Sequence, residues 1–222
     1  SCDDILNGMI DDQFPLKIWQ TGSGTQTNMN VNEVISNIGA LKNGSVIGKN
    51  NPLHPNDDVN KCQSTNDTFP AAIQISVAKE INNKLFHSID KIHESLESKK
   101  EAWKSFIKIG RTHFQDAVPI TYGQEISSWS DQIKQSKESI LKSLEDLYHL
   151  PLGGTAVGTG INCPPTFSEK TIRFISKETN LPFKKSENYF SLMSSHDRLA
   201  NIMSQLKNLA CSLFKISNDI KI

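Results

Sequence analysis

Residues 199–220, LANIMSQLKNLACSLFKISNDI, decide the fold class of this protein, because large aliphatic side chains recur there every three or four positions. The steps alternate between three and four residues, which is the a/d pattern of helices that pack along a shared seam. Such a seam needs partner helices to cover it. The repeating positions are Leu199, Ile202, Leu206, Leu209, Leu213, Ile216 and Ile220.

Two earlier segments carry a similar apolar stripe, and with 199–220 they predict an all-α bundle of long helices. We expect one helix behind a cap at Asn66 or Asp67, with Pro70 in its first turn. Its stripe runs from Ile73 to Leu96. A shorter helix is expected over 32–41. No internal repeat and no strong strand alternation competes with this interpretation.

Two capping boxes mark further helix starts. Thr121 with Gln124 opens the second long helix, and Thr166 with Glu169 opens a short one, because each pair can satisfy two backbone N–H groups reciprocally. His149 is expected at the C-terminal end of the second long helix, where the helix dipole favours a cation. A short extended segment is expected at 106–109.

Composition excludes several classes of function. The 222 residues contain 24 basic and 24 acidic side chains, so the formal net charge is zero, which argues against a protein that follows a nucleic acid backbone with a basic face. No apolar run approaches the length of a membrane span. The four cysteines match no zinc-binding spacing and indicate reduced thiols in an intracellular protein.

Five polar runs at helix boundaries share neutral hydroxyls, amides and glycines with few charges. Neutral donors and backbone N–H groups suit a small carboxylate and a transition state in which negative charge builds on carboxylate oxygens. His113, next to Thr112, is the natural proton handler near neutral pH. The five runs are 21–30, 54–58, 63–67, 110–116 and 152–160.

Each run also has a plainer explanation. By composition alone, residues 21–30 are better explained as a capped loop, since the same residue types favour turns. His54 beside Asp57 and Asp58 lacks a second ligand set at metal spacing, so a turn is favoured over a metal site. Gly158-Thr159-Gly160 is a weak dinucleotide signal without a preceding strand, and no Lys follows to make a phosphate-binding loop. His113 alone could be a satisfied histidine in a turn.

Taken in order, these runs resemble the class II fumarase branch of the fumarase/aspartase superfamily. The resemblance covers nearly the whole chain. It implies an all-helical fold in which long central helices of four subunits form one bundle and each active site draws on several subunits. The matching motifs are Ser23 to Glu33, His54 to Asn60, Gln63 to Asp67, Gly110 to Asp116 and Leu152 to Gly160.

The nearest rival by resemblance is aspartate ammonia-lyase of the same superfamily. That branch typically has Gln at the place of His113, Asn at the place of His54, and Gly-Ala-Thr at 153–155, so these positions favour fumarase. Cys62 and Thr65 are more similar to the ammonia-lyase. A non-catalytic helical protein on the same scaffold is the alternative from a different class.

The resemblance implies reversible hydration of fumarate to L-malate without metal or cofactor. His113 would transfer a proton, through a water or a paired acid. A second dicarboxylate site would lie at the entrance, although Asn51 stands where the family usually has an arginine. The implied substrate-binding residues are Ser23, Gly24, Thr25, Ser64, Thr65, Asn66 and Thr112, and the implied second-site residues are His54, Pro55, Asn56 and Asp57.

The resemblance also predicts that parts of the family's fold lie outside these residues. Residues 1–18 would be the end of an N-terminal domain, and 19–222 a truncated central bundle without the C-terminal domain. The family's mobile serine-containing loop, whose serine would be the C–H base, has no match here. We therefore expect these 222 residues alone to be inactive and the intact protein to be a tetrameric fumarase, cytoplasmic or mitochondrial.

Overall fold

The computed structural model describes residues 1–222 and divides into two compact units. Unit 1 comprises Ser1–Ile75 and His149–Ser195, and unit 2 comprises Ser76–Tyr148 and His196–Ile222. Helices dominate both, which confirms the predicted all-α class. No helix combines the length and the apolar composition needed to cross a membrane.

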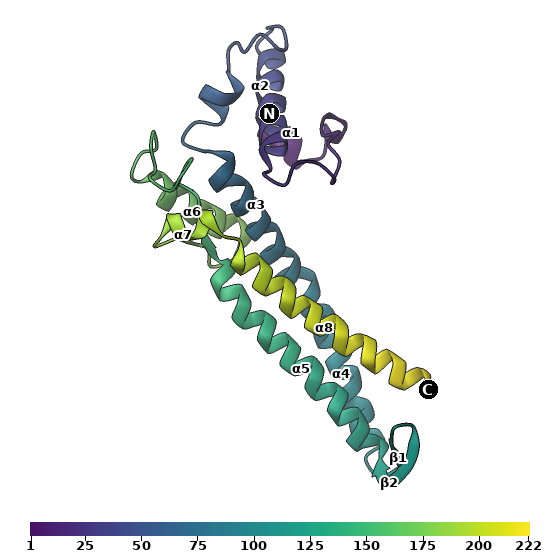
Figure 1. Ribbon diagram of the computed structural model, residues 1–222. Coiled ribbons are helices and arrows are strands. Elements are labelled where there is room, and N and C mark those ends of the chain that lie inside the picture. The colour runs from purple at the N-terminus through teal and green to yellow at the C-terminus, as the bar shows by residue number, and fades with distance from the viewer. The chain divides into compact units, whose positions relative to one another are not determined.

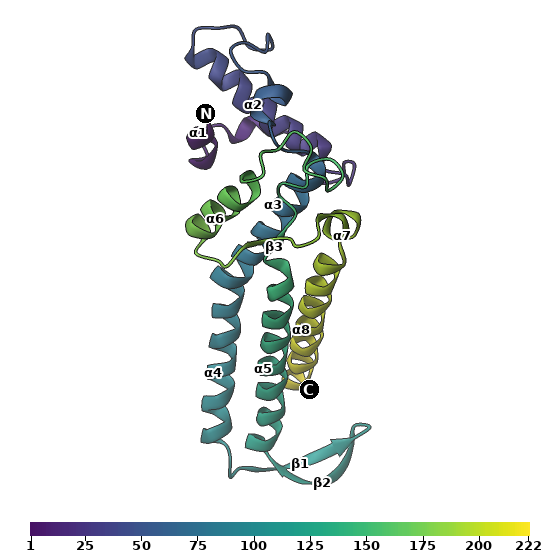
Figure 2. The ribbon, with the colours of Figure 1, turned by 90° about the vertical axis from the view of Figure 1, so that its left-hand side faces the viewer.

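Unit 2 is built on three long helices that lie side by side, α4 (Phe86–Ala102), α5 (Tyr122–Leu147) and α8 (Asp197–Lys221) (Figures 1 and 2). α5 packs against both α4 and α8. The last residues of α3 (Thr65–Glu80) lead through one π-helical turn, η3 (Ile81–Leu85), into α4.

The predicted stripe of α5 forms the centre of unit 2. Six side chains of this stripe are at most 8% exposed, which confirms the period of three and four read from the sequence. Trp129 also donates its indole N–H to Asp219 on α8, with Nε1 and Oδ2 3.1 Å apart. The six residues are Ile126, Trp129, Ile133, Ile140, Leu144 and Leu147.

The seam of α8 is only half filled within one chain. Ile202, Leu209 and Ile216, seven residues apart, are buried. The alternate row of Leu199, Leu206 and Leu213 is half-buried, and Ile220 is 66% exposed. One row of the predicted a/d seam therefore packs inside the unit, while the other leaves apolar surface uncovered.

A two-stranded hairpin joins α4 to α5. β1 (Ile107–Thr112) pairs antiparallel with β2 (Gln115–Thr121), which extends the short segment expected at 106–109. The predicted capping box of α5 is present, since Gln124 N donates to Thr121 Oγ1 at 3.1 Å and Thr121 N donates to Gln124 Oε1 at 2.9 Å.

Unit 1 holds shorter helices and turns around the first residues of α3. Its longest helix is α2 (Thr25–Lys42), preceded by α1 (Cys2–Leu6) and the 3₁₀ turn η1 (Asp11–Gln13). A π-helical turn, η2 (Pro55–Val59), packs against α2. The later residues form β3 (His149–Leu150), α6 (Phe167–Thr179), β4 (Lys184–Lys185) and α7 (Tyr189–Ser194), with β3 and β4 paired in parallel.

Several predicted boundaries were wrong. α2 begins at Thr25 instead of residue 32, and α3 begins at Thr65, so Pro70 lies beyond its first turn. Thr166 makes no side-chain cap, and its φ of −89° and ψ of −5° are helical, whereas an N-cap residue normally has extended backbone angles. His149 lies in β3 beyond the end of α5, because its backbone pairs with Lys184.

Candidate functional site

The first predicted motif lies at the N-terminus of α2. Gly24 is the N-cap residue, with a φ of +77°. A Cβ built there would lie 2.1 Å from Cδ1 of Phe69, so only glycine allows α2 to approach the ring of α3 so closely. Two exposed hydroxyls flank it, and Ser23 Oγ lies 3.5 Å from Thr25 Oγ1. These hydroxyls are placed at the helix end that favours anions.

Asn28 on the first turn of α2 brings the other motifs to this place. Its side-chain Nδ2 donates to Thr65 Oγ1 at 3.0 Å and lies 3.3 Å from Asn60 Oδ1. Thr65 is the first residue of α3, and Asn60 follows η2. Residues of three motifs, 32 and 37 positions apart from Asn28 in sequence, therefore meet at one amide.

The run at 54–58 forms a self-contained turn. His54 Nδ1 accepts hydrogen bonds from the backbone N–H groups of Asn56 at 3.3 Å and Asp57 at 3.1 Å. Asp58 Oδ2 accepts from the N–H of His54 at 2.7 Å, and Pro55 is buried. Asn56 and Asp57 are exposed. No group of three or more metal-ligating side chains lies here or elsewhere in the protein.

The start of α3 carries the third motif. Ser64 Oγ accepts from the N–H of Asn66 at 3.2 Å, which holds the first helical turn. Thr65 is 9% exposed, whereas Asn66 is exposed to solvent. The Asn66 side chain reaches the fifth run, where its Nδ2 donates to the carbonyl of Ala156 at 2.7 Å.

Asp67 connects this helix start to the glycine-rich run at 152–160. Its carboxylate is fully buried, and Oδ2 accepts the N–H groups of Gly153 at 3.0 Å and Thr155 at 2.9 Å. Oδ1 accepts from Ser64 N at 2.9 Å and lies 3.1 Å from Thr68 Oγ1. Burial raises the pKa of Asp67, and these four donors oppose that rise by stabilising the charged form.

Thr155 lies in a strained conformation beside this carboxylate. Its φ is +55°, which is unusual for a β-branched residue and costs roughly 1–3 kcal/mol. The side chain is 4% exposed, and its Oγ1 has no hydrogen-bond partner. The strained backbone and the unpartnered buried hydroxyl both oppose folding, so surrounding contacts must hold the loop in this conformation.

Thr112 and His113 lie in unit 2, at the tip of the β1–β2 hairpin. Thr112 pairs with Gln115, so His113 and Phe114 form a two-residue turn with φ values of +49° and +60°. Positive φ at both positions is the pattern of a type I′ turn, which normally takes Asn-Gly. Both Thr112 and His113 are exposed. The sequence placed His113 in a turn but not in this strained one.

Two thiols lie next to the same region of unit 1. All four cysteines are free, as the composition predicted. Burial raises the pKa of the Cys163 thiol, and the neighbouring Cys62 side chain and the Asp67 charge add to that rise. Cys62 directly precedes the third motif along the chain and has a φ of +66°.

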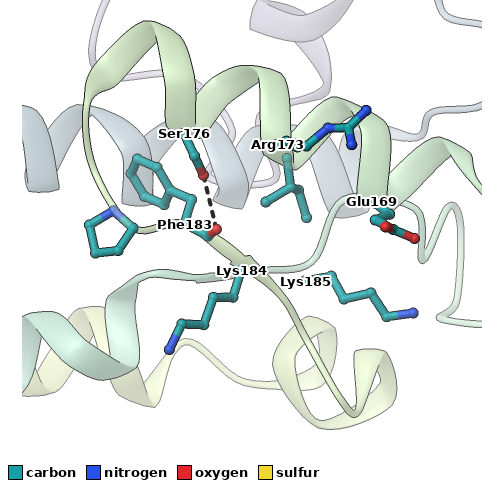
Figure 3. Close-up of a pocket in the computed structure, with 8 residues that line it drawn as sticks. Glu169, Arg173, Ser176, Phe183, Lys184 and Lys185 are labelled. Carbon is teal, nitrogen blue, oxygen red and sulfur yellow. Dashed lines mark hydrogen bonds between the residues drawn. The ribbon is translucent and has the colours of Figure 1, made fainter.

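A separate cavity of about 430 Å³ lies between α6 and β4 in unit 1 (Figure 3). Ser176 Oγ donates to the carbonyl of Phe183 at 2.9 Å beside it. The cavity contains no residue of the five polar runs. Its lining residues are Glu169, Ile172, Arg173, Ser176, Pro182, Phe183, Lys184 and Lys185.

Unit 1 thus collects four of the five runs, and the sequence did not predict the burial of Asp67 or the backbone strain at Thr155. Asp67 was read only as part of a motif or a cap, since nothing in composition marks a carboxylate as fully buried. The four glycines of 152–160 predicted a close approach of the backbone to another group, and the N–H groups at 153 and 155 bind the Asp67 carboxylate. A positive φ at Thr155 has no sequence signal at all.

Comparison with known proteins places this arrangement in a family. The family model described as "Lyase" matches residues 1–222, so the chain belongs to that lyase family. It is 65% identical over its whole length to the class II fumarate hydratase of Prochlorococcus marinus subsp. pastoris, and 49% identical over 98% of its length to that of Chlamydia caviae. The chain spans 48% and 47% of these relatives, about half their length.

Solved structures agree with the family assignment. The class II fumarase of Schistosoma mansoni superposes with a TM-score of 0.89 at 42% identity, over 98% of this chain and 49% of that one. A fumarate lyase:delta crystallin protein of Brucella melitensis superposes with a TM-score of 0.90 at 34% identity, over 99% of this chain and 47% of that one.

Proposed function

We propose that this chain belongs to a class II fumarate hydratase, which adds water to fumarate and removes it from L-malate in the anti sense. The observation that carries the proposal is the meeting of three motifs at the Asn28 amide, which contacts Asn60 and Thr65. These neutral groups suit a small dicarboxylate better than a phosphate or a metal. The names of the relatives support the same reaction.

The difficult step is removal of a C–H proton next to a carboxylate. The product carries an extra negative charge that spreads onto the carboxylate oxygens, so donors aimed at those oxygens stabilise it. We assign this role in unit 1 to the hydroxyls and amides of Ser23, Thr25, Ser64, Thr65 and Asn66, with the backbone at Gly24. Thr112, on the hairpin of unit 2, is assigned the same kind of role.

His113 would protonate the departing hydroxyl or accept a proton through a water. It is exposed on the hairpin of unit 2, a position suited to completing a site on another subunit. The uncovered row of α8 supports an oligomer, because Leu206 and Leu213 are only half-buried and Ile220 is 66% exposed. We propose a homotetramer in which several subunits contribute to each active site.

The turn at 54–57 is proposed as a second dicarboxylate site. The exposed Asn56 amide lies beside Asp57, with Nδ2 and Oδ1 3.1 Å apart. His54 Nδ1 is already used to cap η2. Because Asn51 stands where an arginine would add a charge-assisted contact, we expect binding at this site to be weak.

The domain boundaries and the cellular compartment are proposed from the same likeness to class II fumarate hydratases. Residues 1–18 would end an N-terminal domain and 19–222 would belong to the central bundle of the enzyme. The compartment proposed is cytoplasmic or mitochondrial.

The test follows the ultraviolet absorbance of fumarate when the full protein, as its gene encodes it, is given L-malate. Absorbance should rise, and His113→Asn should reduce that turnover severely while the far-ultraviolet helical signal stays unchanged. Release of ammonia from aspartate, with no turnover of malate, would favour the ammonia-lyase. Inactivity on both substrates would favour a structural protein, and full activity of His113→Asn would remove that residue from its proposed role.

A further inference from the structure

The buried carboxylate of Asp67 divides its hydrogen bonds between two segments. Oδ1 accepts from the start of α3, through Ser64 N and Thr68 Oγ1, and Oδ2 accepts from the N–H groups of Gly153 and Thr155. No cationic side chain lies within ion-pair distance of it. One fully buried acidic group therefore ties the helix start to the glycine-rich loop, and only a carboxylate offers acceptors on both sides.

This connection fixes the orientation of the neighbouring Asn66. The amide of Asn66 donates one N–H to the carbonyl of Ala156, with Nδ2 and O 2.7 Å apart. Ala156 directly follows Thr155, which Asp67 binds through its N–H. With one N–H committed to the loop, the second N–H and Oδ1 of this exposed amide are left to face a ligand.

Thr155 gives an independent sign that the loop is held against its own preference. Its φ of +55° and its unpartnered, buried Oγ1 both oppose folding. Such a conformation persists only where its surroundings over-determine it. The hydrogen bond from Thr155 N to Asp67 is one such constraint, and the next residue supplies the carbonyl that orients Asn66.

We propose that Asp67 is a positioning residue of the substrate site, which sets the amide of Asn66 through residues 153–156 and so determines how tightly the dicarboxylate is held. This rests on the proposed function, in which Asn66 contacts substrate. Asp67 itself is fully buried and touches no substrate. In Asp67→Asn, an NH₂ group would face either the donors of α3 or those of the loop, so one side of the connection is lost.

The test compares Asp67→Asn with Ser168→Ala in the full protein as encoded. Ser168 is a matched control because its Oγ, also buried, donates to the carbonyl of Leu152 at 2.6 Å and so holds the same loop without involving Asn66. We expect Asp67→Asn to raise KM for L-malate about tenfold and Ser168→Ala to change it less than twofold. Simple loss of folded protein lowers the apparent kcat and leaves KM unchanged, so KM separates positioning from stability.

A KM for Asp67→Asn within threefold of wild type would overturn the proposal, whatever happens to kcat. An equal rise in Ser168→Ala would also overturn it, since the effect would then belong to the loop as a whole. If Asp67→Asn does not fold, Thr68→Val replaces it, because this removes one donor to Oδ1, and the same threefold limit decides.

The proposed function can fail while the connection made by Asp67 still holds, so the connection has a test of its own. If wild-type protein turns over no malate, the connection is judged by hydrogen exchange at the amides of Gly153 and Thr155. Asp67→Asn should then accelerate exchange at both amides at least tenfold relative to Ser168→Ala, while α5 keeps its protection. Unchanged exchange at these two amides would refute the connection itself.

Discussion

Substitution of Gly24 by alanine tests how closely α2 must approach α3. Two costs combine there. The φ of +77° disfavours any Cβ by about 1–2 kcal/mol, and a Cβ placed 2.1 Å from the Phe69 ring forces a rearrangement of about 1–3 kcal/mol. We therefore expect Gly24→Ala to lower the free energy of unfolding by about 2–5 kcal/mol.

Two other glycines separate these costs. Gly44 has a φ of +68° with no atom within 4 Å of a built Cβ, so Gly44→Ala reports the backbone term alone. Gly22 has open space and no positive φ, so Gly22→Ala should be neutral or stabilise by up to about 1 kcal/mol through the unfolded state. The expected order of stability is therefore Gly22→Ala, then Gly44→Ala, then Gly24→Ala.

The assay is urea unfolding followed by far-ultraviolet circular dichroism, with hydrogen exchange in α2 and α3 to localise the effect. Gly24→Ala should also accelerate exchange in the first turns of both helices, whereas Gly44→Ala should affect only the C-terminal end of α2. If Gly24→Ala costs no more than Gly44→Ala, the Phe69 ring moves away freely, and the reasoning about close approach is refuted.

Three further outcomes are expected. Thr155→Gly should raise the free energy of unfolding by about 1–2 kcal/mol in urea titrations, because the relief of the strain at positive φ exceeds the entropic cost of glycine. Destabilisation would show that the backbone of Thr155 is not strained. Ile140→Ala, at a fully buried position of α5, should lower the free energy of unfolding by about 2–5 kcal/mol in the same titration. The neighbouring Leu141, which is 44% exposed, is the control, and Leu141→Ala should cost less than about half as much. Equal losses would contradict the assigned core. Leu213→Glu should lower the mass measured by light scattering toward that of the monomer while helicity is retained. Lys207→Glu, at an exposed position of α8, should leave the mass unchanged. An unchanged mass for Leu213→Glu would place the oligomer contact elsewhere.

The spacing of apolar residues along the chain was sufficient to predict the long helices of unit 2. The six stripe positions of α5 are all buried, and the capping box at Thr121 has both of its hydrogen bonds. Period and capping act over a few residues, so a short window of sequence contains the physical information they need. The predicted capping box at Thr166 is absent. The backbone of Thr166 is helical, and its side chain makes no N-cap hydrogen bond.

The sequence predicted the polar runs as one set, but it did not predict which of their donors bind which acceptors. Residue types indicated neutral donors at 21–30, 54–58 and 63–67, and the structure brings Asn28 of the first run together with Thr65 of the third and with Asn60, which lies just beyond the second. In the glycine-rich run, the N–H groups at 153 and 155 bind the buried carboxylate of Asp67. Which donor meets which acceptor depends on residues 86 and 88 positions apart, a separation that local sequence patterns do not encode.

The sequence by itself determined the helical class, the a/d seam of 199–220 and the neutral chemistry of the candidate site, because periodicity and residue type are properties of the chain. Only the tertiary structure decided that one row of that seam is filled by α5 while Leu206 and Leu213 stay half-buried. It also decided that Asp67 is fully buried and that His113 lies in a strained turn. Burial and backbone strain depend on which distant segments pack against a residue, and that is settled only when the whole chain has folded.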